Sequence, residues 1–185
     1  SREVSGKTAT LVGLGGTGTA IAQRAHAFGI RCLAVDPDVT EAPESVDQLV
    51  QPDQLLDLIR DSDIIFVCCP RTPETKHMID QAVFDAMWPN GYVISVTRGG
   101  IIDEQAMIDA LDSGKLAGAG LDVTAEEPLP DDSPLWSYEN VLITPHTAGA
   151  SQYRIERMLE RVFTNIERFQ RGDELEGIID KRKGY

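Results

Sequence analysis

The chain has 185 residues and a formal net charge of −13 at pH 7, from 30 acidic and 17 basic side chains. This acidic balance argues against nucleic acid or an anionic membrane surface as a partner. Hydrophobic residues make up 42% of the sequence, enough for a buried core, so we exclude a disordered chain and expect one domain, or one domain with an appendage.

Continuous apolar runs alternate with helix-like segments along most of the chain. The predicted strands are residues 8–14, 31–35, 64–69, 92–97, 117–123 and 141–144. The first four lack polar alternation, as expected for strands covered on both faces. The predicted helices between the strands are residues 17–28, 52–60, 74–87 and 104–113, the last with Asp103 as N-cap and Gly114 as its left-handed end. This alternation predicts an α/β fold with a doubly wound parallel sheet, the Rossmann fold.

A last helix is predicted for residues 151–170. Its apolar residues follow helical spacing and form one broad face, made of Ile155, Met158, Leu159, Val162, Phe163, Ile166 and Phe169. The simplest expectation is that this face packs on the sheet of the same domain.

The three cysteines, Cys32, Cys68 and Cys69, lie inside predicted strands. Neighbouring strand residues point to opposite faces, so Cys68 and Cys69 are poorly placed to bridge each other. We expect three reduced core thiols. No apolar run approaches the ~20 residues of a membrane span, and the sequence starts without a signal-peptide pattern. These features predict a cytoplasmic protein.

A glycine-rich turn follows the first predicted strand, in "TLVGLGGTGTAIA". Gly13 allows the tight turn, Gly15 lets the backbone approach a pyrophosphate, and Gly18 lets helix and strand pack closely. Asp36 ends the next predicted strand, where its carboxylate can accept hydrogen bonds from both ribose hydroxyls and would repel a 2′-phosphate. A glycine turn alone is a weak signal, but strand, helix and acid together predict a dinucleotide site that favours NAD over NADP.

Three chemically active residues follow later predicted strands: Arg98, Glu127 and His146. Each has an ordinary alternative: a surface ion pair, a solvated acid or a structural histidine. Ligands of open parallel sheets bind beyond the carboxyl ends of the strands, which favours one shared site. Arg98 offers a planar fork for a carboxylate, and the two glycines after it let a ligand come close. His146 could move a proton, and Glu127 would orient its ring and favour the imidazolium form.

Several stretches in series carry a resemblance to a known family. They are "VGLGGTGTAIA", "CCPRTPETKHMI", "VTRGGIIDEQAMIDAL", "GAGLDVTAEEPLP" and "NVLITPHTAG", which together cover most of residues 5–150. The sequence resembles the NAD-binding domain of the D-isomer-specific 2-hydroxyacid dehydrogenases. The resemblance implies that Arg98 binds the carboxylate and carbonyl of a 2-keto acid and that His146 is the acid/base. It makes Glu127, rather than Glu126, the partner of His146.

The resemblance also implies NAD as cofactor, and we expect no metal site. The residues predicted to bind or border the cofactor are Gly13, Gly15, Gly16, Thr17, Gly18, Asp36, Cys69, Pro70, Thr75, Thr97 and Asp122. Two of the chain's residues depart from the family pattern. Thr17 replaces a branched apolar residue, and its hydroxyl could reach a phosphate. Arg71 replaces an apolar residue; it could favour a substrate with an extra negative charge or face solvent, and solvent is the preferred interpretation.

Family members carry a substrate-binding domain of about 100 residues before this point, a size within the ordinary domain range. We therefore expect residues 1–150 to be an isolated cofactor domain, and residues 151–185 to be a helix and tail that would return to the absent domain. Such a chain should bind NAD but turn over 2-keto acids poorly. This cofactor-binding half is compatible with several enzymes of the family: hydroxypyruvate or glyoxylate reductase, D-lactate dehydrogenase and 3-phosphoglycerate dehydrogenase. Glu127 argues against a formate dehydrogenase, which pairs its histidine with Gln.

Two alternatives concern partners. An NAD(H)-sensing module related to transcriptional corepressors can keep the same triad, and it stands below the enzyme interpretation. The loop "EEPLPDDSPLWSYENV" either folds back on its own domain or projects Leu129, Leu135, Trp136 and Tyr138 into a contact with a second copy. The resemblance favours the second interpretation, a homodimer.

Overall fold

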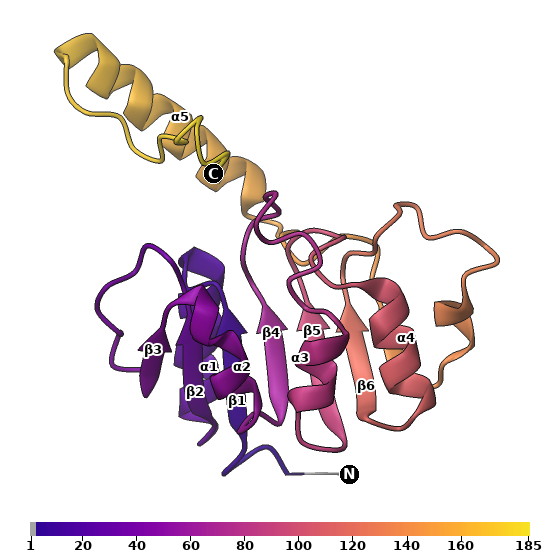
Figure 1. The fold of residues 1–185 in the computed structure, drawn as a ribbon. Helices are drawn as coiled ribbons and strands as arrows, with labels where there is room; N and C mark the ends of the chain where they lie inside the picture. The colour runs from indigo at the N-terminus through magenta and orange to yellow at the C-terminus, as the bar shows by residue number, and fades with distance from the viewer. Residues whose placement is uncertain (1–2) are drawn as a thin grey trace. The chain divides into compact units, whose positions relative to one another are not determined.

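A computed structural model describes residues 3–185. Its framework is one seven-stranded sheet with the order β3-β2-β1-β4-β5-β6-β7, in which every neighbouring pair is parallel. The strands, most of them labelled in Figure 1, are β1 (Thr8–Val12), β2 (Arg31–Val35), β3 (Gln48–Val50), β4 (Ile64–Val67), β5 (Gly91–Ser95), β6 (Leu116–Leu121) and β7 (Val141–Ile143). The order reverses between β1 and β4, as in a doubly wound Rossmann sheet.

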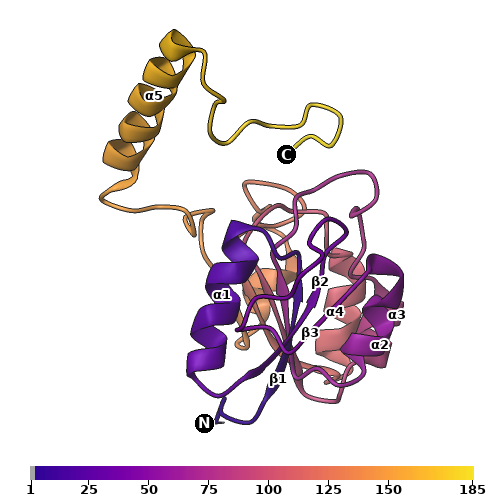
Figure 2. The ribbon, with the colours of Figure 1, turned by 90° about the vertical axis from the view of Figure 1, so that its left-hand side faces the viewer.

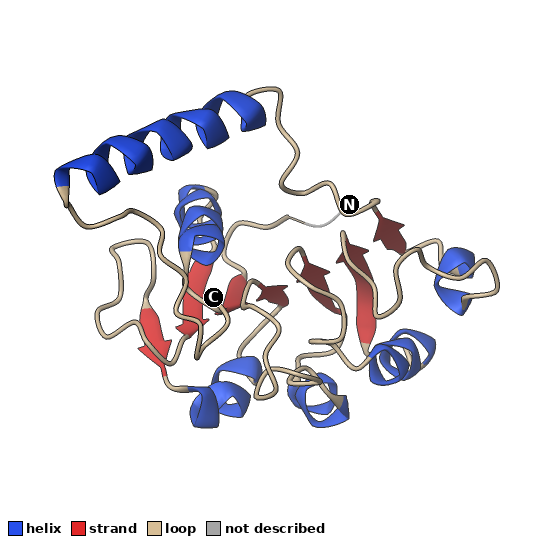
Figure 3. Cartoon of the chain, turned by 90° about the horizontal axis from the view of Figure 1, so that it is seen from above, coloured by secondary structure: helices blue, strands red, loops and turns tan. Residues whose placement is uncertain are grey.

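The helices flank the sheet on both faces. They are α1 (Gly16–Ala27), α2 (Leu55–Ile59), α3 (Gln81–Ala86) and α4 (Glu104–Asp112), with 3-10 turns η1 (Pro52–Gln54) and η2 (Pro134–Ser137). Figure 2 shows α1 on one face and α2, α3 and α4 on the other. Seen from above, the strands form one row with helices beside it (Figure 3). Right-handed parallel crossovers give this division, because the chain winds outward in opposite directions from β1.

Two apolar clusters fill the space between sheet and helices. Leu11 of β1 belongs to the cluster that includes Ala22 and Ala25 of α1, whereas its neighbour Val12 belongs to the cluster with Phe84 of α3 and Met107 of α4. Successive strand residues point to opposite faces, so a strand buried on both sides needs apolar residues at every position. The continuous apolar runs of the sequence are explained in this way.

Two local predictions were wrong. Strand β3 was not predicted, because its three residues lie in an acidic, weakly apolar stretch and gain their order by pairing with β2. The helix predicted for residues 74–87 is shorter: only Gln81–Ala86 is helical, with Asp80 as its cap. Ile79 instead pairs with Ile102 of the loop after β5, and its N–H donates to the Ile101 carbonyl oxygen at 3.2 Å. Pairing between distant segments has outweighed local helix propensity here.

The cysteines are free and buried, as predicted. Burial raises the pKa of the Cys68 thiol to about 12, and the nearby thiol of Cys69 adds to this shift. Burial likewise raises the pKa of Cys69 to about 11. Thiols with such pKa values stay protonated at neutral pH and are poor nucleophiles. All three therefore contribute to packing.

The loop between β6 and β7 folds back on its own domain. Leu135 is 1% exposed, and Leu129 and Tyr138 pack against the core, where the Tyr138 hydroxyl donates to Asp112 at 2.5 Å. Trp136 remains 54% exposed, with its indole N–H donating to the Pro130 carbonyl oxygen at 2.9 Å. The expectation that all four side chains project from the loop is therefore wrong for three of them.

The chain divides into two compact units, one ending at His146 and one from Thr147 to Tyr185. The second unit contains α5 (Arg154–Arg171), which ends at Gly172 with a left-handed φ of 74°. None of its residues is buried, and its apolar face, from Ile155 to Phe169, is exposed. In the described part of the chain, no helix combines the length and apolar character that crossing a membrane requires.

Candidate active site

The predicted site residues come from the loops after six strands of the first unit. The glycine turn follows β1, Asp36 follows β2, Cys69 and Pro70 follow β4, and Arg98 follows β5. The remaining loops carry Asp122 and Glu127 after β6, and His146 after β7. All these strands are parallel, so their carboxyl ends lie along one edge of the sheet, where ligands of doubly wound folds bind.

The four glycines of the turn fall into two kinds. Gly13 and Gly18 are packed against backbone: a Cβ on Gly13 would lie 2.7 Å from the Cys69 nitrogen, and one on Gly18 would lie 2.1 Å from the Gly13 oxygen. Around Gly15 and Gly16 a Cβ would meet nothing within 4 Å. The protein's own packing requires glycine at positions 13 and 18, whereas Gly15 and Gly16 leave open space at the start of α1. That space fits the phosphates of a dinucleotide.

The start of α1 has the electrostatic character of an anion site. Gly15 is its N-cap, no side chain caps the first turn, and no acidic residue lies in it. The free N–H groups and the positive end of the helix dipole there favour a phosphate. Thr17 lies in this first turn, and the Thr19 hydroxyl donates to the Leu14 carbonyl oxygen at 3.1 Å.

Asp36 is 9% exposed and serves the turn itself. Its Oδ2 accepts from the Leu14 N–H at 2.7 Å, and its Oδ1 accepts from the N–H groups of Asp38 and Val39 at 2.9 and 3.0 Å. A carboxylate offers about four acceptor positions, so about one, on Oδ2, remains for a ribose hydroxyl. The sequence predicted that Asp36 accepts hydrogen bonds from both ribose hydroxyls, and this stays a prediction. The three backbone donors leave the carboxylate room to accept one such bond.

The two kinds of glycine lead to a matched pair of variants of this chain. Gly18→Ala should lower the free energy of unfolding by about 3 kcal/mol, because its Cβ would collide with the Gly13 backbone. Gly15→Ala should leave stability nearly unchanged and weaken NADH binding about tenfold, or about 1.4 kcal/mol. Urea unfolding and calorimetric titration with NADH measure both quantities. Wild-type NADH affinity in Gly15→Ala would contradict a phosphate site at this turn.

Hydrogen bonds tie the loops after β4 and β5 together. The Thr97 hydroxyl donates to the Cys69 carbonyl oxygen at 2.9 Å, and the Thr75 hydroxyl donates to the Pro70 carbonyl oxygen at 2.8 Å. Thr75 therefore shapes the turn rather than presenting a free hydroxyl. In the loop after β6, Asp122 is 6% exposed and accepts from the Thr144 hydroxyl at 2.6 Å. These predicted cofactor neighbours line the strand ends between the glycine turn and His146.

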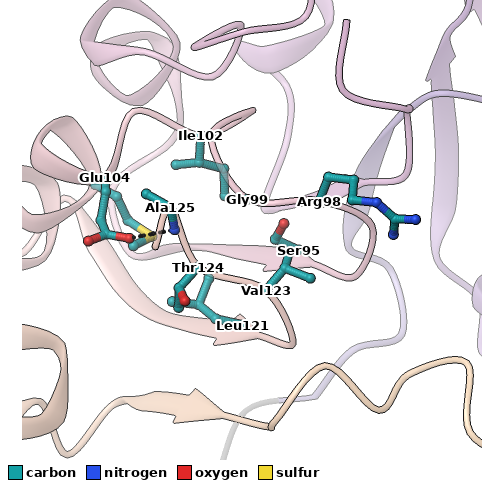
Figure 4. A pocket seen from close by; sticks show the side chains of 11 residues that line it. Ser95, Arg98, Gly99, Ile102, Glu104, Leu121, Val123, Thr124 and Ala125 are labelled. Atoms are coloured by element: carbon teal, nitrogen blue, oxygen red, sulfur yellow. Dashed lines mark hydrogen bonds between the residues drawn. The ribbon is translucent and has the colours of Figure 1, made fainter. Parts of the chain in front are cut away.

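Arg98 stands at the end of β5 with an exposed side chain. Its Nη1 donates to the carbonyl oxygen of Thr97 at 2.7 Å. In Figure 4 the guanidinium points away from a small interior gap lined by Ser95 and Leu121 among others. Gly99 beneath it is packed: a Cβ there would lie 1.7 Å from the Thr124 carbonyl oxygen. The loop is thus anchored through Gly99, while the arginine fork stays open to a ligand.

His146 and Glu127 form a hydrogen-bonded pair. His146 Nδ1 lies 2.7 Å from Glu127 Oε2, and the two side chains are 45% and 37% exposed. The carboxylate only accepts, so Nδ1 carries the proton and Nε2 is left to exchange one. The other carboxylate oxygen accepts from the Thr124 N–H at 3.3 Å. The backbone of His146 is left-handed, with φ of 53°, and its N–H donates to the carbonyl oxygens of Asp122 and Thr144 at 3.0 Å.

One open pocket of about 410 Å³ brings these groups together. It is lined by Arg71, Arg98, Gly99, Thr124, Ala125, Glu127 and His146. Arg71 is exposed, as the preferred interpretation predicted, but it also lines this pocket. Among the described residues, no cluster of His, Cys, Asp or Glu is arranged to hold a metal ion.

Sequence reasoning missed two residues that hold the Glu127 loop. Glu104 Oε2 accepts from the Ala125 N–H at 3.1 Å (Figure 4). The Thr124 hydroxyl donates to the Glu126 carbonyl oxygen at 2.6 Å, which folds the loop so that Glu127 reaches His146. Nothing in the sequence singles out Glu104, because an acid in the first turn of a helix is common. Its role depends on the contact between α4 and a loop that lies 21 residues further along the chain.

Comparison with known proteins identifies similar chains. A family model described as "D-isomer specific 2-hydroxyacid dehydrogenase, NAD binding domain" matches residues 1–148. A glyoxylate reductase of Korarchaeum cryptofilum is 39% identical over 171 residues, covering 92% of this chain and 51% of that protein. A D-3-phosphoglycerate dehydrogenase of Methanocaldococcus jannaschii is 36% identical over 180 residues, covering 96% of this chain and 34% of that protein.

Solved structures agree in fold. A D-isomer specific 2-hydroxyacid dehydrogenase from Xanthobacter autotrophicus Py2, in complex with NADPH and MES, matches with a TM-score of 0.91 and 33% identity. The match covers 100% of this chain and 75% of that chain. The chain spans about half the length of the first curated relative named above.

Proposed function

This chain belongs to the D-isomer specific 2-hydroxyacid dehydrogenase family, and from that membership we propose that it is the cofactor-binding part of an enzyme that reduces a 2-keto acid to a D-2-hydroxy acid with NADH. The observation that carries the proposal is the pocket shared by Arg98, Glu127 and His146, with the histidine bound to the carboxylate at 2.7 Å. The pocket offers a fork for a carboxylate and a proton donor in one place.

The chain's own residues divide the work between binding and proton transfer. Arg98 binds the substrate carboxylate and the keto oxygen, which fixes the face of the carbonyl that is attacked. Nε2 of His146 gives its proton to the keto oxygen as the hydroxyl forms, and Glu127 stabilises the charged ring before that transfer. When bound, the nicotinamide cofactor supplies the hydride to the keto carbon. In the reverse direction, His146 takes the hydroxyl proton.

We further propose that the cofactor is NAD rather than NADP. Asp36 supports this choice because a buried carboxylate beside the ribose would repel a 2′-phosphate. The solved relative from Xanthobacter holds NADPH, so the two nucleotides are the ones to compare on this chain.

Titration of this chain with NADH and, separately, with NADPH tests the cofactor proposal. We expect clear saturation with NADH and an affinity for NADPH at least about tenfold lower, a difference of about 1.4 kcal/mol. Equal binding of the two nucleotides would contradict the role of Asp36. Binding of neither would contradict a complete cofactor site within residues 3–185. A screen of 2-keto acids with the full-length protein then tests the reaction.

We also propose the organisation of the full-length protein. Residues 1–150 would act with a substrate domain, and residues 151–185 would return to it. We infer a cytoplasmic location and a homodimer. The exposed apolar side chains of Trp136 and Leu142 favour the dimer. Sedimentation equilibrium tests this state, and a monomer would contradict it. A corepressor-like role is not proposed, since the relatives named above are a reductase and dehydrogenases.

A further inference from the structure

Arg71 is a second arginine at the proposed substrate pocket, and the reaction described above gives it no role. It stands in the loop after β4, and its guanidinium lies over Gly100. A Cβ built on Gly100 would lie 3.3 Å from both Cζ and Nε of Arg71, tighter than ordinary contact. Gly100 also has a left-handed φ of 77°. Gly100, two residues after Arg98, has no side chain, and the Arg71 guanidinium lies in the space that a side chain there would fill.

The charge of Arg71 is not balanced by a neighbour. Within residues 3–185, no carboxylate lies within ion-pair distance of its guanidinium, and the acid of the same pocket, Glu127, is bound to His146. The Arg98 guanidinium donates to a backbone carbonyl oxygen, which leaves its charge intact. Two arginines thus face one carboxylate that is already in use, on a chain with a net charge of −13. A positive pocket on an acidic protein concentrates anions locally.

The position of Arg71 argues against a role in binding the cofactor's phosphates. The open positions suited to a pyrophosphate are Gly15 and Gly16, and no residue of that turn lines the pocket of Arg71. Its neighbours in the pocket are Arg98 and His146, which the proposed function assigns to the substrate. A guanidinium binds a carboxylate or a phosphate through parallel hydrogen bonds, so the anion that suits Arg71 is one carried by the substrate.

We propose that Arg71 is a specificity-determining residue that binds a second anionic group on the substrate. The preferred substrate is then a 2-keto acid whose carbon chain carries a further carboxylate or phosphate. This inference rests on the proposed function, because it takes Arg98 as the residue that binds the carboxylate next to the keto group. Arg71 binds the distant anion, and a 2-keto acid with a single charge engages Arg98 alone.

The test measures kcat/KM of the full-length protein for three kinds of substrate. Pyruvate and hydroxypyruvate carry one charge, oxaloacetate and 2-oxoglutarate carry a second carboxylate, and 3-phosphohydroxypyruvate carries a phosphate. We expect the wild type to prefer at least one doubly anionic substrate by about 10- to 100-fold over the singly charged ones, the range of a hydrogen bond to a charged group. The comparison of oxaloacetate with 3-phosphohydroxypyruvate identifies which anion is bound.

Three variants isolate the side chain. Arg71→Leu should remove the preference for the doubly anionic substrate, with kcat/KM for pyruvate changed less than about threefold. Arg71→Lys should keep part of the preference, because it retains the charge and loses the fork. Lys76→Leu removes a cation from the same loop outside the pocket and should leave the preference intact. Thermal melting and NADH affinity are measured for each variant and should match the wild type.

The outcomes separate this inference from the proposed function. If Arg71→Leu leaves the substrate ratio unchanged, Arg71 faces solvent only and the inference is wrong. If it lowers kcat/KM equally for all substrates, or weakens NADH binding, Arg71 acts on the loop or the cofactor, and the inference is equally wrong. If the wild type reduces pyruvate but prefers no second charge, the inference fails while the proposed function stands. If the wild type reduces no 2-keto acid, both fail together.

Discussion

Replacing Arg98 with alanine in the full-length protein is expected to lower kcat/KM for 2-keto acids by about 10²- to 10³-fold, the size found when a donor to a developing oxyanion is removed. The reason is geometric: Arg98, which has no carboxylate partner among residues 3–185, contributes its guanidinium to the pocket that also contains His146. Without the Arg98 guanidinium, the substrate carboxylate is no longer held, and the keto carbon is no longer oriented toward the hydride donor. Steady-state kinetics with NADH in excess measure this loss.

The cofactor provides the control for this variant. NADH affinity should stay within about twofold of the wild type, because the Arg98 side chain is exposed and its removal leaves the anchored Gly99 in place. Arg98→Lys should recover only part of the activity, since an ammonium keeps the charge but cannot form two parallel bonds. Loss of NADH binding together with activity would identify Arg98 as a structural residue and contradict its role toward the substrate.

Replacing His146 with asparagine should lower kcat by about 10²- to 10⁴-fold, the usual contribution of a positioned acid or base. Asparagine suits the left-handed backbone at this position, where φ is 53°, so the fold should tolerate the change. It cannot exchange a proton. KM for the 2-keto acid should change little, because Arg98 still binds the carboxylate. Rapid-quench or steady-state measurement of kcat, with unfolding followed in parallel, tests this expectation.

The neighbouring acids give a matched pair for the same test. Glu127→Gln replaces the carboxylate that accepts from His146 Nδ1 and should lower kcat by at least about tenfold, because an amide stabilises the charged ring less than a carboxylate does. Glu126→Gln removes the same charge one residue earlier, where only the backbone oxygen is used, and should leave kcat within about twofold. Equal effects of the two substitutions would mean that the negative charge of the loop, and not the hydrogen bond between Glu127 and His146, sets the rate.

Much of the fold could be predicted from the sequence because its signals are local. The apolar runs predicted six of the seven strands, and the lack of alternation in the first four predicted burial on both faces. The failures lie where long-range pairing decides. A helix was predicted from residue 74, yet residues 73–77 form a turn and Ile79 pairs with Ile102. Likewise, the sequence could not show that Leu135 is buried whereas Trp136 is exposed.

The candidate site divides in the same way. The sequence by itself determined which residues are the candidates: the spaced glycines, Asp36, Arg98, Glu127 and His146, since residue type and position after a strand are local properties. Only the tertiary structure decided how they combine. It brought Glu127 within 2.7 Å of His146, showed three backbone donors on Asp36, and placed the Arg71 guanidinium over Gly100. These contacts join loops from different strands, and their geometry depends on the packing of the whole sheet, which no local pattern encodes.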